Sequence, residues 1–129
     1  MTPREALAGR LVALAGEDVA VGAAPIRSGA PPLIILAPGT PYIRPVAVDP
    51  ECTWSMRIDA WCVTSREDVH ALDSQDELVD LVRKAADDPS WTADGMVCAF
   101  LGVERANVAT EDLAGIPGLA TIVQLRIDA

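Results

Sequence analysis

Apolar and polar positions alternate most clearly over residues 52–64, CTWSMRIDAWCVT, which we predict to be the central strand of a sheet. Every second residue of this stretch is apolar, and these six should face the core: Cys52, Trp54, Met56, Ile58, Ala60 and Cys62. The opposite face mixes charged residues with Trp61 and Val63. A face open to solvent would not need these two side chains, so we expect something to cover it, and a second subunit is one candidate.

Two helices are predicted from spacing and capping residues. The first has Thr2 as N-cap, Pro3 at the first helical position and Glu5 in the capping-box position, and it stops at Gly16. Its packing face carries apolar side chains at helical spacing: Leu7, Leu11 and Leu14.

The second helix is predicted over residues 66–87, as one continuous element ended by Asp87-Asp88-Pro89. Two capping boxes are available to start it, Ser65 with Asp68 and Ser74 with Glu77. Its later part has an apolar arc, and acidic residues precede basic ones, as the helix dipole favours. The residues of that arc are Leu78, Leu81, Val82 and Ala85.

Shorter apolar runs predict further strands at residues 19–23, 33–37, 96–106 and 119–127, with turns or loops at 25–32 and 107–118. Runs of strands interrupted by two helices indicate an α+β fold. We therefore predict one domain over residues 1–129. It should have a mostly antiparallel sheet of four to five strands and two helices packed on one face.

Residues 38–51 are predicted to project from this domain as a loop. Prolines at positions 41, 45 and 50 argue against a continuous central strand, because proline cannot donate a ladder hydrogen bond. The apolar side chains of the segment have no obvious core to enter: Tyr42, Ile43, Val46 and Val48. Two interpretations remain open, an arm that contacts a neighbour and a plain surface loop.

Composition narrows the classes of function. The 129 residues are 50% hydrophobic with a mean hydropathy of +0.26, and 10 basic against 19 acidic residues give a formal net charge of −9. This balance argues against charge-driven binding to nucleic acid or anionic membranes. Three cysteines do not suggest a disulfide framework, and no apolar run reaches the length of a membrane span. We expect a soluble protein of a reducing, intracellular compartment.

Candidate chemistry is sparse, and we do not expect an enzyme, a metal site or a cofactor. His70 is the single histidine and falls in a predicted helix. Cys52 and Cys62 are separated by roughly 33 Å along a strand at about 3.3 Å per residue, so they cannot share a metal. Cys98 completes no CxxC motif. The paired acidic residues lie in loops without the convergence that a catalytic pair requires.

The order of the elements resembles that of the tail terminator proteins, also called head-to-tail joining proteins, of long-tailed bacteriophages, especially those of actinobacterial hosts. The likeness runs from the capped helix MTPREALAGRLVAL through the long aromatic-bearing strand and the helix LDSQDELVDLVRKA to the closing strand IVQLRIDA. The likeness spans nearly the whole chain and rests on the order of the elements, the length of the chain and the general character of its sequence. The Pro-rich segment at 38–50 and the cysteines depart from the family's general appearance.

The resemblance implies a structural protein of the virion, at the head–tail junction, assembled in the host cytoplasm. Proteins of that family form a hexameric ring that caps the tail tube, stops its polymerisation and joins it to the head connector or stopper protein. DNA passes through the ring's channel, and excess acidic charge suits such a channel because like charges prevent tight phosphate contacts.

A ring needs a heterologous interface between copies. For this interface, or one with a partner, we predict Tyr42, Ile43, Arg44, Val46, Val48, Trp61 and Val63. The alternatives are a small cytoplasmic protein-binding module that acts through residues 38–51, and a cofactor-free enzyme whose site the sequence does not display.

Overall fold

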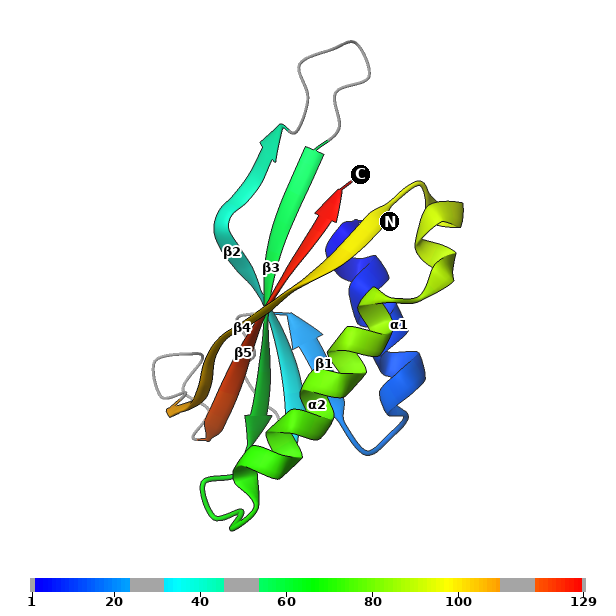
Figure 1. Ribbon diagram of the computed structural model, residues 1–129. Helices are drawn as coiled ribbons and strands as arrows, with labels where there is room; N and C mark the ends of the chain where they lie inside the picture. The colour runs from blue at the N-terminus through cyan, green and yellow to red at the C-terminus, as the bar shows by residue number, and fades with distance from the viewer. Residues whose placement is uncertain (1, 24–31, 46–53, 110–117, 129) are drawn as a thin grey trace.

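The computed structural model of the chain describes residues 2–23, 32–45, 54–109 and 118–128. Its elements, in order, are α1 (Pro3–Ala15), β1 (Ala20–Ala23), β2 (Leu33–Pro45), β3 (Trp54–Thr64), α2 (Ala71–Ala86), the 3-10 helix η1 (Pro89–Asp94), β4 (Val97–Ala109) and β5 (Leu119–Asp128). The predicted α+β fold is confirmed, with a mostly antiparallel sheet of five strands (Figure 1). None of the described helices is long and apolar enough to cross a membrane.

The sheet has the strand order β1-β2-β3-β5-β4, so β3 occupies its centre as predicted. Only β1 and β2 pair in parallel, and all the other neighbours are antiparallel. The β3–β5 ladder runs without a register shift from Ser55↔Asp128 to Thr64↔Leu119. The central pair of strands is therefore regular, and the irregularities lie in the strands on either side of it.

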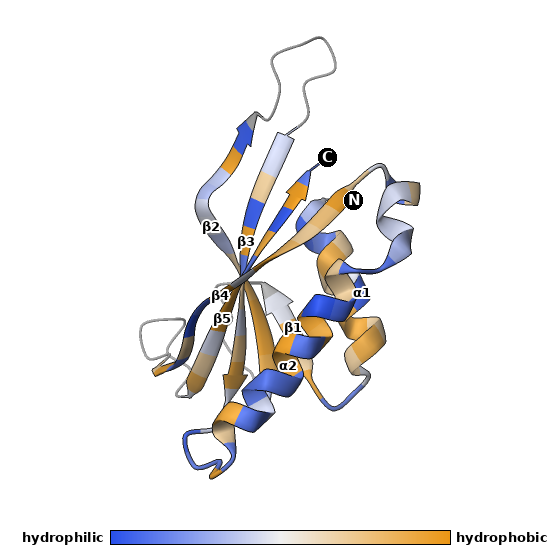
Figure 2. Cartoon of the chain, in the orientation of Figure 1, coloured by the Kyte–Doolittle hydropathy of each residue, from blue (hydrophilic) through white to orange (hydrophobic). Residues whose placement is uncertain are grey.

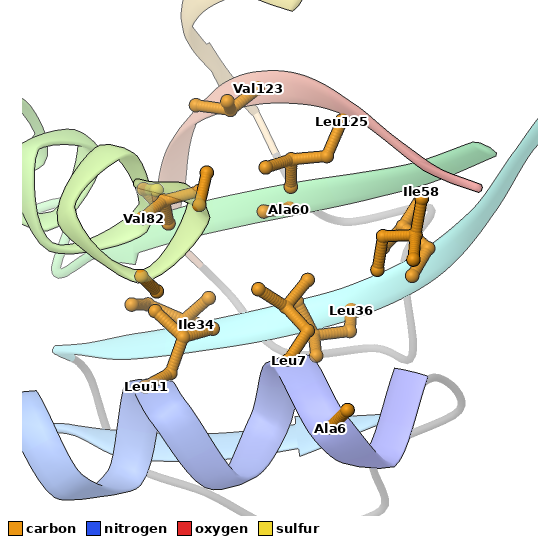
Figure 3. Close-up of a cluster of buried hydrophobic side chains, with 14 of the residues drawn as sticks. Ala6, Leu7, Leu11, Ile34, Leu36, Ile58, Ala60, Val82, Val123 and Leu125 are labelled. Carbon is orange, nitrogen blue, oxygen red and sulfur yellow. The ribbon is translucent and has the colours of Figure 1, made fainter. Parts of the chain in front are cut away.

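Both helices cover one face of the sheet, and the main core lies between these helices and the sheet (Figure 3). From α1 come Leu7 and Leu11, and from α2 comes Val82, all completely buried. They meet apolar side chains that β2, β3 and β5 contribute to the same face: Ile34, Leu36, Ile58, Ala60, Cys62, Val123, Leu125 and Ile127.

Helix α1 forms as its capping residues predict. The Glu5 backbone N–H donates to Thr2 Oγ1 at 3.2 Å, and the Thr2 backbone N–H donates to Glu5 Oε2 at 3.2 Å, which completes the capping box. The prediction that Leu14 packs is wrong, since it is 46% exposed. The buried residues that α1 contributes to the core end at Leu11.

Helix α2 begins at Ala71, so the predicted continuous helix over residues 66–87 is wrong at its start. The carboxylate of Asp68 accepts a hydrogen bond from the His70 backbone N–H at 2.8 Å and one from the Ser74 hydroxyl at 2.9 Å. These bonds hold residues 65–70 as a turn ahead of the helix. Ser74 therefore lies inside the first turns of α2 and is not its N-cap.

The predicted loop at 38–51 is also wrong as far as Pro45, because β2 continues to that residue; residues 46–51 lie outside the described residues. The ladder with β3 is interrupted between Pro38, which pairs with Ile58, and Ile43, which pairs with Met56. Pro41 lies in this bulge, where no ladder hydrogen bond is required of it. Among the described residues, β1 pairs with β2 only as far as Leu36, so the later part of β2 is an edge there, where proline is tolerated.

Strand β4 extends to Ala109, so the first three residues of the predicted 107–118 loop belong to the strand, and residues 110–117 lie outside the described residues.

Helix η1 was not predicted. It carries Trp91, which is 3% exposed and donates from Nε1 to the Ala85 carbonyl oxygen at 2.8 Å. The Arg10 guanidinium lies 3.8 Å from the centre of the Trp91 ring and forms an ion pair with Asp94, which joins η1 to α1.

Neighbouring residues on α1 provide a test of this packing. Leu11→Ala should lower the free energy of unfolding by about 2–5 kcal/mol, because it opens a cavity in the core. Val12→Ala should change it by no more than about 0.5 kcal/mol, because Val12 is 53% exposed. Urea denaturation followed by circular dichroism measures both values, and equal losses would show that α1 is packed differently.

Candidate protein-binding groove

The sheet is longer than either of the two helices that cover it, α1 and α2. Thirteen residues of α1 span about 20 Å at 1.5 Å per residue. The eleven residues of β3 span roughly 33 Å at about 3.3 Å per residue. Helix α1 begins at Pro3, short of the start of β3, where Trp54 is 53% exposed (Figure 1). Among the described residues, the helix-covered face of the sheet is therefore open at this end.

An apolar groove lies at this open end. Ile43 of β2, Met56 of β3 and Ile127 of β5 form a row across three adjacent strands, because Met56 pairs with both of the others. Together with Pro3 and Trp54 they line a groove of about 420 Å³. All five lining residues are apolar. The groove can therefore bind a partner through apolar contact and shape, as the buried centre of a protein–protein interface does.

Two lining residues expose much of their side chains, Trp54 at 53% and Ile43 at 49%. Isolated exposed apolar residues are ordinary, but a tryptophan and an isoleucine in one groove form a continuous apolar surface. Tryptophan is also among the residues that most often dominate binding energy at interfaces. Trp54 was predicted to lie on the core-facing side of β3, and that face is correct, but the core ends before reaching it.

The structure separates the seven predicted interface residues. Ile43 lines the groove, while its neighbours Tyr42 and Arg44 are half-buried and exposed, respectively. Val46 and Val48 lie outside the described residues. The predicted site missed Pro3, Trp54, Met56 and Ile127. Comparing the predicted lengths of the first helix and the long strand could have identified them, because the helix is too short to cover that strand.

Trp61 and Val63 lie on the sheet face opposite the helices, as predicted. Val63 is completely buried there against Leu33, Ile35 and Ala120, so its side chain has no exposed surface for the predicted interface. Trp61 is partly buried and packs against the same cluster. An interface role for Trp61 stays a prediction.

Asp59 and Trp61 are two residues apart in β3, so their side chains lie on the same face of the sheet. Burial raises the pKa of this carboxyl group above its ordinary value, the nearby Glu104 raises it further, and Arg57 partly opposes the rise.

The backbones of β2 and β3 approach closely at Gly39. A Cβ added to Gly39 would lie 2.8 Å from the Cβ of Arg57, so only glycine fits where the β2 bulge crosses β3.

Among the described residues, the side chains that could act as nucleophiles or metal ligands do not come together at one site. Within residues 2–23, 32–45, 54–109 and 118–128, no three His, Cys, Asp or Glu side chains are placed to hold a metal. Cys62 and Cys98 are free thiols, and burial raises the pKa of each to about 12. A thiol with such a pKa is almost entirely protonated at neutral pH, so neither is an activated nucleophile. His70 is exposed at the start of α2.

A scan of the sequence against protein-family models gives no match, and a search of the curated proteins gives none either.

The two tryptophans at positions 54 and 91 test whether the groove is surface or core. Trp54→Ala should lower the free energy of unfolding by about 1 kcal/mol or less, because half of its side chain is already in water. Trp91→Ala should lower it by about 3–5 kcal/mol, because it removes a buried ring. Thermal and urea denaturation compare the two, and a loss at Trp54 as large as that at Trp91 would make Trp54 part of the core.

The raised pKa of Asp59 predicts a pH dependence of stability. Above the ordinary carboxyl pKa the folded chain binds this proton more tightly than the unfolded chain, so stability falls as pH rises through that window. Asp59→Asn should remove this component and raise stability at pH 7 relative to the parent.

Asp80→Asn is the matched control, of opposite sign. Hydrogen bonds from Arg83 at 2.7 Å and from Lys84 at 3.0 Å hold the pKa of Asp80 below its ordinary value. Its contribution to stability is therefore lost as pH falls. Urea midpoints measured from pH 3 to pH 8 test both variants. Parallel curves for Asp59→Asn and the parent would contradict the assignment.

Proposed function

We propose that this protein is a structural component of a long-tailed bacteriophage virion. In this role it forms a ring that caps the tail tube, stops polymerisation of the tube and joins it to the head connector or stopper protein. Its partners are other copies of itself, the tail tube protein and the connector, and DNA only passes through the ring. The protein is assembled in the host cytoplasm and resides at the head–tail junction.

The observation that carries the proposal is the apolar groove at the open end of the sheet. Exposed Trp54 and Ile43 side chains, in a groove lined only by apolar residues, favour association with another protein. The elements follow one another in the order on which the resemblance to the tail terminator proteins rests, a helix, three strands, a second helix and two closing strands.

A small protein-binding module is the second candidate, and the same groove supports it. Ile43 belongs to strand β2, so such a module would bind through the sheet surface and not through a projecting loop. The two functions differ in oligomeric state, since a module acts as a monomer or dimer and a cap acts as a ring.

Mass photometry and negative-stain electron microscopy of the full chain test the proposal. We expect rings of six copies around a central channel, either for the protein alone or at the ends of tubes grown from the tail tube protein of the same phage. Tube growth should stop when about one ring is present per tube end. A chain that stays monomeric with the tube protein, and leaves tube growth unchanged, would contradict the proposal.

A further inference from the structure

We propose that the groove of one copy binds the start of helix α2 of a second copy, in a head-to-tail contact. This inference rests on the proposed ring and identifies its interface. The surface that enters the groove comprises Val69 and Leu72 and is called the apolar knob below.

The apolar knob contains Val69, the most exposed large apolar side chain of the described residues. Val69 is 88% exposed and Leu72 is 48% exposed. Both flank His70, the N-cap of α2, in a turn held by the Asp68 carboxylate through the bonds to His70 and Ser74. The knob is therefore presented by an ordered turn, so little conformational entropy opposes its docking.

The groove and the apolar knob lie at opposite ends of the sheet. Strand β3 begins at Trp54 in the groove and ends at Thr64, six residues before His70, which separates the two ends by roughly 33 Å. In Figure 1 the start of β3 and the start of α2 are accordingly at opposite ends of the molecule. One copy therefore cannot fill its own groove, but it can fill that of a neighbour.

The charges at the two ends are complementary. Acidic side chains surround the apolar knob, and Figure 2 shows the turn before α2 as mostly hydrophilic. Within five positions of the knob along the chain there is one basic residue, Arg66, against five acids: Glu67, Asp68, Asp73, Asp76 and Glu77. At the groove, Arg4 follows Pro3, and Arg44 follows Ile43. Neither arginine forms an ion pair within the described residues.

Complementary charge favours the apolar knob over another copy's groove as the occupant. A two-fold contact between two grooves would bring Arg4 and Arg44 of both copies together, and like charges across an interface cost affinity. Docking the acidic knob places opposite charges at the rim. Because the two surfaces differ, the contact is heterologous, and repetition of it produces a ring when the rotation closes.

Complementation between two variants tests the contact directly. Trp54→Ser damages the groove, and the double variant Val69→Ser with Leu72→Ser damages the knob. Val12→Ser is the matched control, an apolar residue 53% exposed elsewhere on α1. Analytical ultracentrifugation of each full-length chain should show self-association weakened at least tenfold by either damaged surface and less than twofold by the control. Association of the parent should also weaken as salt is added.

The mixture gives the decisive result. An equimolar mixture of the groove variant and the knob variant retains one intact groove and one intact knob, so it should form dimers and nothing larger. Circular dichroism checks that each variant folds. If Trp54→Ser does not fold, the knob variant alone decides, because its two changed side chains are exposed.

Other outcomes separate this inference from the proposed function. Normal self-association of both variants, or a mixture without dimers, overturns the groove–knob contact. If Trp54→Ser in that case still abolishes capping of tubes, the groove binds the tube protein, and the proposed function stands without this inference. A parent chain that neither self-associates nor caps tubes overturns both.

Discussion

The mismatch in length between helix and strand governs the surface of this protein. An α-helix rises about 1.5 Å per residue and a strand about 3.3 Å, so neither the thirteen residues of α1 nor the sixteen of α2 can cover the eleven residues of β3 from end to end. The capping box at Thr2 and Glu5 determines where α1 begins. Beyond that point the apolar face of β3 continues without a cover. The core and the groove are thus one apolar face, divided by the position of a helix N-terminus.

The bulge in β2 allows a proline-rich stretch to be part of this arrangement. Four residues of β2 lie between the paired positions Pro38 and Ile43, opposite the single residue Arg57 of β3. Pairing then resumes, with Ile43 opposite Met56. Without this resumption Ile43 would not join the row across the sheet, and the groove would lose one wall. Gly39 makes the crossing possible, because a side chain there would collide with Arg57.

Local rules predicted much of the fold. The caps of α1, the centrality of β3 and the helix-covered face of the sheet followed from spacing and alternation. Misses occurred where a particular side-chain hydrogen bond or a neighbouring strand decides the outcome. Asp68 binds Ser74 and His70 and so delays the start of α2, although the sequence offers two capping boxes. Prolines at 41 and 45 suggested a loop, but the free edge of β2 accommodates them. Val63 looked like spare surface because alternation shows which face a residue occupies and does not show what covers that face.

The candidate site was only half predictable for the same reason. Ile43 was identified as an apolar residue with no core to enter, whereas Trp54 was assigned to the core with the rest of its face. The net charge of −9 affects how copies of the chain meet, and therefore what the exposed Trp54 side chain can bind. Copies of an acidic protein repel one another in most orientations, which keeps an exposed tryptophan from causing indiscriminate association. Repulsion is weakest where the basic residues Arg4 and Arg44 meet an acidic surface. The same charge that opposes random contact therefore favours one ordered contact, that between the groove end and the acidic end.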